Sequence, residues 1–118
     1  DVVEGQGSLF HASFAGVSTG LLHGSQADAL VMCHEPTRAH MRGLPDFKLP
    51  DLELCIERNI ETAQLVNPDV RCIGVAVNTS GLEAGEARDY LAGVADKLGL
   101  PAVDPVRDGV GPIVDRLG

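Results

Sequence analysis

The sequence predicts an α/β fold, with a doubly wound parallel sheet in a three-layer α/β/α arrangement. Two continuous apolar runs, ADALVMC at 27–33 and VRCIGVAV at 70–77, are typical of strands buried on both faces. Amphipathic segments alternate with these runs, and such alternation favours parallel strands joined by right-handed crossovers. Aromatic residues make up only 3% of the chain, so the core is expected to consist of aliphatic side chains.

The remaining elements are predicted from apolar periodicity and from residues that begin or end helices. In chain order they are a strand end at 1–3, a short helix at 14–23, a loop at 34–50, a helix at 52–66, a helix that follows Ser80 and stops at Gly99, a short strand at 102–103 and a helix at 110–117. Asp51 is a suitable N-cap for the helix at 52–66. Ser80 to Glu83 matches a capping box, and Gly99 followed by Pro101 is a stop signal. Because the first strand is cut at residue 1, we expect preceding sequence to belong to the same sheet.

The charge of the chain argues against two broad classes of partner. The formal net charge is −8, and Lys48 and Lys97 are its only lysines. A nucleic-acid-binding surface needs clustered basic residues, and an anionic membrane surface would repel this chain. No apolar run reaches the ~18 residues of a membrane span. We therefore expect a small-molecule partner, with neither nucleic acid nor membrane involved.

Three cysteines, Cys33, Cys55 and Cys72, are far apart and form no CxxC motif. An odd number of separated cysteines favours buried thiols in a reducing compartment over a disulfide framework or a metal site. Cys33 and Cys72 fall within predicted strands, which supports burial. We therefore expect a cytoplasmic protein.

Polar residues gather directly after the predicted strands. In open α/β sheets, ligands bind beyond the carboxyl ends of the strands. The candidate groups, in strand order, are Glu4, Gln6 and Ser8, then His34, Glu35, Thr37, Arg38, His40 and Arg42, then Asn78, Thr79 and Ser80, and finally Asp104 and Arg107. This bias toward strand ends predicts an active or binding site.

The segment EGQGS, Glu4 to Ser8, combines a carboxylate with two glycines. Gly5 and Gly7 would let backbone amides approach a ligand closely, with Gln6 and Ser8 beside them. Glu4 could coordinate Mg²⁺ or accept a proton. The alternative is a tight turn with a surface glutamate.

The segment HEPTRAHMRG at 34–43 is the more specific signal. It places two histidines, one glutamate and two arginines within nine residues. Arg38 and Arg42 can bind carboxylates or phosphates through paired N–H donors, and in so acidic a chain they indicate a small anionic ligand. The alternatives are a solvated loop with incidental charges and a zinc site built from His34 and His40.

The segment NTS at 78–80 follows the strongest predicted strand. Ser80 is expected to cap the next helix, and Asn78 and Thr79 could contact an anion at that helix N-terminus. No GxxxxGK[ST] motif occurs in these 118 residues, so a complete phosphate loop is absent from them.

Three long motifs, EGQGSL, HGSxxDALVxCHEPTRxHMRG and NTSGL, resemble those of a bacterial and archaeal family. That family was long catalogued as a domain of unknown function with a P-loop-like fold. The resemblance covers nearly the whole chain. It implies that residues 1–118 are the latter part of a C-terminal P-loop NTPase-like domain, whose phosphate loop and N-terminal partner domain lie outside this sequence. EGQG is also similar to the EGAGG turn of dethiobiotin synthetases, which implies that Glu4 faces the phosphate loop.

Some members of that family are D-glutamate N-acetyltransferases of D-amino-acid catabolism. The resemblance therefore implies acetyl transfer from acetyl-CoA to the amine of a D-amino acid. This chemistry needs a base and donors that stabilise an oxyanion. Glu35 or His34 could be the base, and Arg38 and Arg42 could hold substrate carboxylates.

Two other functions remain open from the sequence. One is a kinase- or ligase-like enzyme that uses ATP and Mg²⁺, with Glu4 on the metal and Asn78 on the nucleotide base. The other is a non-catalytic oligomerisation module. We expect a homo-oligomer, and we expect this segment alone to be inactive without the phosphate loop.

Overall fold

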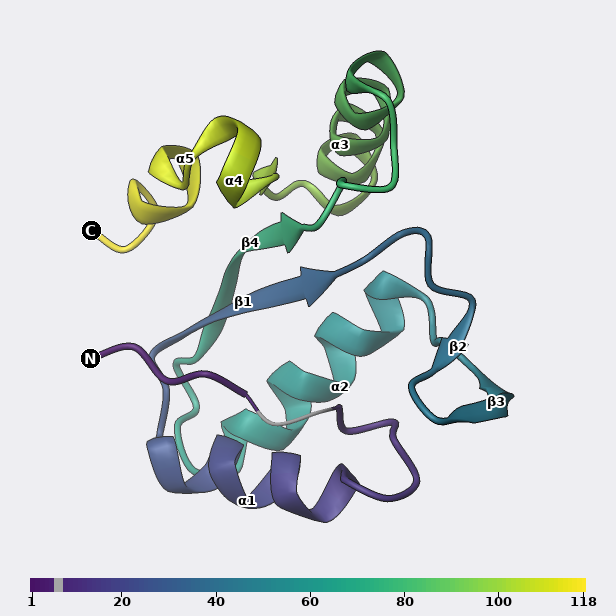
Figure 1. The fold of residues 1–118 in the computed structure, drawn as a ribbon. Helices are drawn as coiled ribbons and strands as arrows, with labels where there is room; N and C mark the ends of the chain where they lie inside the picture. The colour runs from purple at the N-terminus through teal and green to yellow at the C-terminus, as the bar shows by residue number, and fades with distance from the viewer. Residues whose placement is uncertain (6–7) are drawn as a thin grey trace. The chain divides into compact units, whose positions relative to one another are not determined.

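The structure is a computed structural model that describes residues 1–5 and 8–118. Gln6 and Gly7, two of the predicted ligand-binding residues, lie outside the described residues. The chain divides into two compact units, the first formed by 1–30 and 40–71 and the second by 31–39 and 72–118. Figure 1 labels the elements of both units along the chain. Among the described residues, no helix has the length and apolar character needed to cross a membrane.

The first unit is built from two helices and a hairpin. Its elements are α1 (Ala15–Ser25), β2 (His40–Met41), β3 (Leu44–Lys48) and α2 (Leu52–Gln64). Helix α1 packs against α2, and Nε2 of His23 donates a hydrogen bond to the Thr62 carbonyl oxygen at 2.8 Å. The predicted N-cap of α2 is confirmed, because the Asp51 side chain accepts a hydrogen bond from the Glu53 N–H.

The prediction of a loop throughout 34–50 is wrong, because this segment contains an antiparallel hairpin. Strand β2 pairs with β3, with Met41 opposite Leu44. Gly43 lies at the turn with φ of 76°, a conformation that residues with a side chain rarely adopt. Strands of two and five residues are too short to show a clear apolar period, which is why periodicity missed them.

The second unit carries a three-stranded sheet. The remaining elements are β1 (Ala29–His34), β4 (Arg71–Val77), α3 (Ala84–Leu98), β5 (Ala102–Val103), α4 (Pro105–Asp108) and α5 (Gly111–Val114), of which β1 and β4 begin in the first unit. The strand order is β1-β4-β5, and β4 and β5 are parallel. The arrows of β1 and β4 point the same way in Figure 1. The predicted α/β class with a parallel sheet is confirmed.

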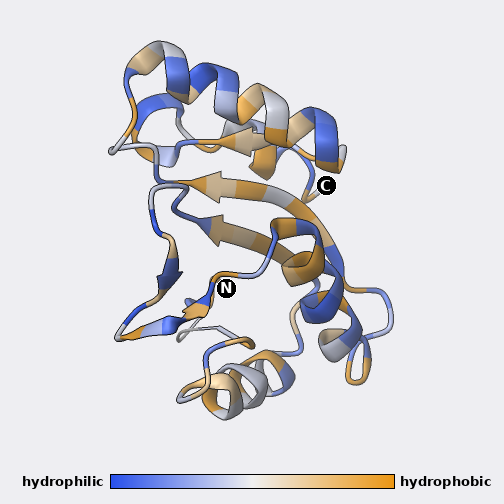
Figure 2. Cartoon of the chain, turned by 90° about the vertical axis from the view of Figure 1, so that its right-hand side faces the viewer, coloured by the Kyte–Doolittle hydropathy of each residue, from blue (hydrophilic) through white to orange (hydrophobic). Residues whose placement is uncertain are grey.

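The core of the second unit lies on the central strand β4. Val75 and Val77 are fully buried, and burial of a valine side chain stabilises a fold by about 1.5–3 kcal/mol. Helix α3 adds Ala87, Leu91 and Val94 from one face. Figure 2 shows this pattern, since the long strands are mostly orange while α3 alternates between orange and blue.

Gly74 of β4 leaves room for α5 against the sheet. A Cβ at this position would lie 2.6 Å from Cγ1 of Ile113 and 3.1 Å from the Pro101 carbonyl oxygen. Ile113 is buried, so it has little space into which to withdraw. A glycine at this position of the strand is therefore a requirement of packing.

Two expectations about strands are wrong. Residues 1–5 form no strand, and Val2 and Val3 are exposed, because none of the described residues pairs with them in a sheet. Strand β1 is not buried on both faces, since Val31 and Cys33 are exposed. Within the described sheet β1 is an edge strand. An apolar run predicts a strand but does not reveal whether neighbouring elements cover both of its faces.

The helices of the second unit also differ from the prediction. Ser80 does not cap α3, because Glu83 is its N-cap residue and Ala84 is its first helical residue. Residues 79–82 form a turn instead. The predicted stop is confirmed, since Gly99 adopts a left-handed φ of 66° at the C-cap. Helix α4 was not predicted, and the helix expected at 110–117 is reduced to α5.

Candidate functional site

An open cleft of about 710 Å³ lies in the second unit, at the carboxyl ends of β1, β4 and β5. Its lining comes from residues within three segments: 33–38, which includes the last two residues of β1; 76–80, which includes the last two residues of β4; and 104–107, which follows β5. Parallel strands place ligands at this edge of a sheet, because loops from several strands converge there. The cleft is therefore the candidate functional site.

His34 ends β1 and contributes an imidazole to the cleft wall. Its Nε2 lies 2.9 Å from the hydroxyl oxygen of Tyr90 on α3, and the two rings are stacked. Burial lowers the pKa of His34, an effect that the neighbouring Glu35 carboxylate partly offsets. His34 is therefore neutral at physiological pH, which is the form in which an imidazole accepts a proton.

Glu35, the other candidate base, is held by its own loop. Nη2 of Arg38 donates to its Oε2 at 3.0 Å, and the Thr37 hydroxyl donates to its Oε1 at 3.3 Å. The Arg38 and Glu35 side chains are 45% and 37% exposed, so solvent screens the ion pair to at most about 1 kcal/mol. A substrate carboxylate could therefore replace Glu35 on Arg38 at low cost.

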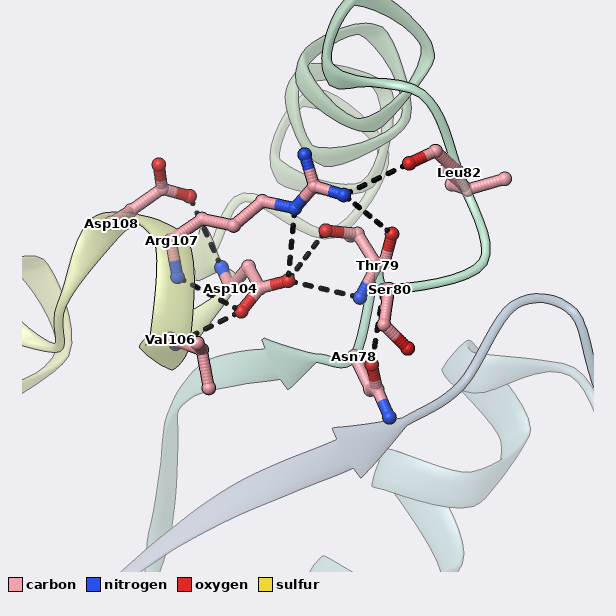
Figure 3. Close-up of polar contacts among 8 residues, drawn as sticks. All are labelled: Asn78, Thr79, Ser80, Leu82, Asp104, Val106, Arg107 and Asp108. Carbon is pink, nitrogen blue, oxygen red and sulfur yellow. Dashed lines mark hydrogen bonds and ion pairs between the residues drawn. The ribbon is translucent and has the colours of Figure 1, made fainter.

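Asp104 is a buried carboxylate that joins two segments of the cleft wall (Figure 3). Its Oδ2 accepts hydrogen bonds from the Thr79 N–H at 3.0 Å and from the Thr79 hydroxyl at 2.5 Å. Its Oδ1 accepts from the N–H groups of Val106 and Arg107, which makes Asp104 the N-cap of α4. These hydrogen bonds, led by that of the Thr79 hydroxyl, lower the pKa of Asp104 to about 2, although burial opposes the shift.

Arg107 completes this network from the first turn of α4. Its Nη2 donates to the carbonyl oxygens of Thr79 at 3.1 Å and Leu82 at 2.9 Å, and its Nε lies 3.8 Å from Oδ2 of Asp104. Figure 3 shows the guanidinium between the 79–82 turn and Asp104. Asp104 and Arg107, which follow β5, are thereby hydrogen-bonded to the turn after β4. The groups of that turn that take part are the N–H, hydroxyl and carbonyl of Thr79 and the carbonyl of Leu82.

Asn78 opens the turn after β4, next to His34. Its backbone N–H donates to the His34 carbonyl oxygen at 2.8 Å, which extends the pairing of β1 and β4 by one residue. Its Oδ1 accepts a hydrogen bond from the Ser80 N–H at 3.0 Å, as in an Asx turn. The side chain of Asn78 is exposed and lines the cleft.

The loops after β1 and β4 also meet at Thr37 and Gly81. A Cβ on Gly81 would lie 2.7 Å from Cγ2 of Thr37 and 3.2 Å from its Oγ1. Both distances are shorter than ordinary van der Waals contact. The glycine of the NTSGL motif is therefore the residue that allows the two loops to approach this closely.

Seven of the candidate groups named from the sequence come together in the cleft wall, namely His34, Glu35, Arg38, Asn78, Ser80, Asp104 and Arg107. Two further predicted residues, Thr37 and Thr79, do not line the cleft but contact the loops that form its wall. Thr37 lies against Gly81, and Thr79 is fully buried with its hydroxyl directed to Asp104. The role of Thr79 is therefore to hold the turn.

The other predicted residues that the structure describes belong to the first unit and do not line this cleft; they are Glu4, Gly5, Ser8, His40 and Arg42. Glu4 and Gly5 are exposed. Ser8 accepts a hydrogen bond from the Phe10 N–H, His40 donates to the Met41 carbonyl oxygen, and the Arg42 carbonyl oxygen accepts from His11. Within 1–5 and 8–118, no three His, Cys, Asp or Glu side chains are grouped to hold a metal ion.

The sequence placed Asp104 and Arg107 among the candidate groups after the last strand without giving either a specific role, and it gave Tyr90 no place in the site. Tyr90 fits the apolar stripe of α3, so periodicity counts it as a core residue. Asp104 precedes Pro105, and an Asp before a Pro is a signal for a helix N-cap that could have been recognised. No local signal marks Tyr90 as the partner of His34.

Comparison with known proteins places the chain among relatives that are about three times as long. Two curated relatives, both named D-glutamate N-acetyltransferase, are 53% identical (Tritonibacter scottomollicae) and 52% identical (Pseudoalteromonas sp) over 117 residues. Each alignment covers 99% of this chain and 35% of the relative. A crystal structure of a DUF1611 family protein from Anabaena variabilis ATCC 29413, at 2.30 Å resolution, is similar with a TM-score of 0.86 and 32% identity. That similarity covers 95% of this chain and 33% of the other.

The family match extends over almost all of the chain. Residues 1–114 match the family described as "Domain of unknown function (DUF1611_C) P-loop domain". The chain therefore belongs to the DUF1611 family and is a portion of its C-terminal P-loop domain.

Proposed function

We propose that the full-length protein transfers the acetyl group of acetyl-CoA to the amine of a D-amino acid such as D-glutamate. The observation that carries this proposal is the identity of 53% and 52% to two relatives named D-glutamate N-acetyltransferase. The aligned region spans all three segments that line the cleft. The role that we propose is catabolic and cytoplasmic, since acetylation blocks the amine of a D-amino acid and draws on the cytoplasmic pool of acetyl-CoA.

In this proposal His34 is the general base. An amine attacks a thioester only after it loses a proton, and the base must be neutral at the working pH. His34 meets that condition, because burial lowers its pKa. In the tautomer that this role requires, Nε2 carries the hydrogen and donates it to the Tyr90 hydroxyl oxygen, so that Nδ1 holds the lone pair that takes the proton.

Arg38 is the proposed site for a substrate carboxylate. Its guanidinium lies in the cleft and is paired with Glu35 across a partly exposed contact of 3.0 Å. D-Glutamate brings two carboxylates, and a bidentate pair with one of them would be stronger than the single contact to Glu35. Glu35 would then be released toward solvent or toward the substrate ammonium.

A second candidate function, binding of a nucleotide with Mg²⁺, is favoured by the description of the family as a P-loop domain. The sequence has no complete phosphate loop. The described residues hold no group of three metal ligands. A nucleotide site would therefore need a phosphate loop from elsewhere in the full-length protein.

The test is thiol release by the full-length protein supplied with acetyl-CoA and either D-glutamate or L-glutamate. We expect CoA thiol to appear faster with D-glutamate, together with a matching amount of N-acetyl product. Titration calorimetry with acetyl-CoA and with Mg-ATP, in parallel, separates the two candidates. Absence of thiol release with D-amino acids, or heat of binding from Mg-ATP alone, would contradict the proposal.

A further inference from the structure

We infer that Asn78 is a catalytic residue of this reaction, whose side-chain amide nitrogen donates a hydrogen bond to the oxyanion of the tetrahedral intermediate. The inference rests on the proposed function and assigns a further role within the same cleft. It depends on the orientation of one amide, on its neighbour His34 and on the rigidity of the turn that carries it.

The orientation of the Asn78 amide is set by Ser80. The Ser80 backbone N–H lies 3.0 Å from the amide, and because an N–H can only donate, the atom that faces it must be the acceptor Oδ1. Nδ2 consequently lies on the side of the amide that is turned away from Ser80, as Figure 3 shows. No residue that the structure describes accepts a hydrogen bond from Nδ2, so both of its N–H donors remain for a ligand.

Asn78 lies beside the proposed base. The hydrogen bond of 2.8 Å from the Asn78 N–H to the His34 carbonyl oxygen places the two residues on neighbouring strand ends, whose backbones are about 4.8 Å apart. Both residues line the cleft. A neutral imidazole and an amide donor at one edge of a sheet are the two groups that acyl transfer to an amine requires.

The turn that carries Asn78 is held in place before any ligand binds. The next residue, Thr79, is fully buried, and Asp104 accepts hydrogen bonds from both its N–H and its hydroxyl. Arg107 donates to its carbonyl oxygen. A donor stabilises developing charge most when its position needs no reorganisation, and this network supplies that rigidity.

Two guanidinium nitrogens of the cleft are already bound by the protein itself. Nη2 of Arg107 is bound to two carbonyl oxygens, and Nη2 of Arg38 is bound to Glu35. Among the described residues that line the cleft, Asn78 alone carries a side-chain amide. The cleft also balances its formal charges, since Glu35 pairs with Arg38 and Asp104 with Arg107. An oxyanion there would be stabilised by a neutral donor.

His34 takes one proton from the substrate ammonium, and the amine nitrogen then attacks the thioester carbonyl carbon, so that a C–N bond forms. The carbonyl π electrons move to oxygen, where Asn78 Nδ2 donates its hydrogen bond. When the C=O bond re-forms, the C–S bond breaks and its electrons leave with sulfur. The second nitrogen proton goes to the CoA thiolate, and His34 returns its proton to solvent.

The test compares Asn78→Ala, Asn78→Asp and the control Gln64→Glu in the full-length protein. Asn78→Asp keeps the acceptor for the Ser80 N–H and therefore the turn, but it removes the donor. We expect kcat to fall about 10²- to 10³-fold in both Asn78 variants, with little change in KM for acetyl-CoA, because the donor acts on the transition state. Gln64→Glu makes the same kind of amide-to-carboxylate change at an exposed residue of α2 that does not line the cleft, so it is the matched control, with kcat close to that of the wild type.

The outcomes distinguish this inference from the function on which it rests. If the wild-type protein releases no thiol with D-amino acids, the proposed function is contradicted, and the role inferred for Asn78 is contradicted as well. If the wild type is active and Asn78→Asp retains wild-type kcat, only the inference about Asn78 is overturned. A rise in KM with unchanged kcat would also overturn it, since that result would make Asn78 a ground-state binding residue. The melting temperature of Asn78→Asp, expected to be close to that of the wild type, checks that the variant is folded.

Discussion

Asp104 accepts two hydrogen bonds from Thr79 on a single carboxylate oxygen, one from the backbone N–H at 3.0 Å and one from the hydroxyl at 2.5 Å. The two residues are 25 positions apart in the chain and follow the neighbouring strands β4 and β5. This contact attaches two of the three segments that line the cleft to each other. Both residues are buried, so water does not compete for the contact.

Asp104→Asn is expected to destabilise the protein. All groups that bond the carboxylate are donors, so an amide must turn its NH₂ toward one of them. The loss should be on the order of 2 kcal/mol, or about 5 °C in melting temperature. Thermal unfolding of the full-length variants measures it. Asp108→Asn, which alters a single longer contact of 3.3 Å on the same helix, is the control. Equal shifts in the two variants would contradict a special role for Asp104.

The depressed pKa of Asp104 predicts a specific loss of stability in acid. Its folded-state pKa is about 2, below the ordinary value of 3.8, so the carboxylate stabilises the fold fully above about pH 4. That contribution is lost as the pH falls from about 4 to about 2. Unfolding midpoints of the wild type and Asp104→Asn should therefore converge across this range. A constant difference between pH 5 and pH 2 would show that the pKa is not depressed.

Gly81→Ala is expected to disturb the cleft through Thr37. The new Cβ would lie 2.7 Å from Cγ2 of Thr37, and overpacking of this kind costs about 1–3 kcal/mol. Because Thr37 is in the loop of His34 and Arg38, kcat/KM should fall together with melting temperature. Adding Thr37→Ser to the Gly81→Ala variant removes the clashing methyl group. The double variant should therefore recover part of the lost kcat/KM and part of the lost melting temperature.

Gly93→Ala in α3 is the matched control for Gly81→Ala. A Cβ at Gly93 meets no atom within 4 Å, and alanine is favoured over glycine in a helix by up to ~1 kcal/mol. We expect unchanged activity and a slightly higher melting temperature. If Gly81→Ala and Gly93→Ala have the same activity and the same melting temperature, the close approach of the two loops does not depend on Gly81.

Glu35→Gln separates the two candidate bases by the pH dependence of kcat/KM. The Glu35 carboxylate raises the pKa of His34 against the larger effect of burial, so its removal should lower that pKa further. If His34 is the base, activity persists and its acidic limb moves to lower pH, because the imidazole stays neutral in more acid. Tyr90, which also contacts His34, stays uncharged in this range, since burial raises its pKa.

A result of the opposite kind would identify Glu35. Loss of activity at every pH in Glu35→Gln, with His34→Gln still active, would make the carboxylate the base. We expect the reverse, with a loss of about 10²- to 10⁴-fold in His34→Gln. Rates measured between pH 5 and pH 9 with D-glutamate and acetyl-CoA decide between them.

Several elements could be predicted because their signals are local. The apolar run of β4, the N-cap Asp51 of α2 and the stop at Gly99 depend on residues within one or two turns of each other. The capping box at Ser80 failed for a physical reason. Arg107 donates hydrogen bonds to the carbonyl oxygens of Thr79 and Leu82, and these bonds stabilise residues 79–82 as a turn. The helix therefore starts after this turn, at Ala84.

Within the candidate site, the sequence by itself determined which strand ends carry polar side chains. His34, Glu35, Arg38, Asn78 and Ser80 line one cleft because parallel strands direct their carboxyl ends to the same edge. Only the tertiary structure decided which of those groups are buried and which hydrogen-bond partners they have. Contacts between Asp104 and Thr79, or between Tyr90 and His34, join residues 25 and 56 positions apart. Burial and hydrogen bonding set by such long-range contacts determine pKa values and donor directions, and no local pattern encodes them.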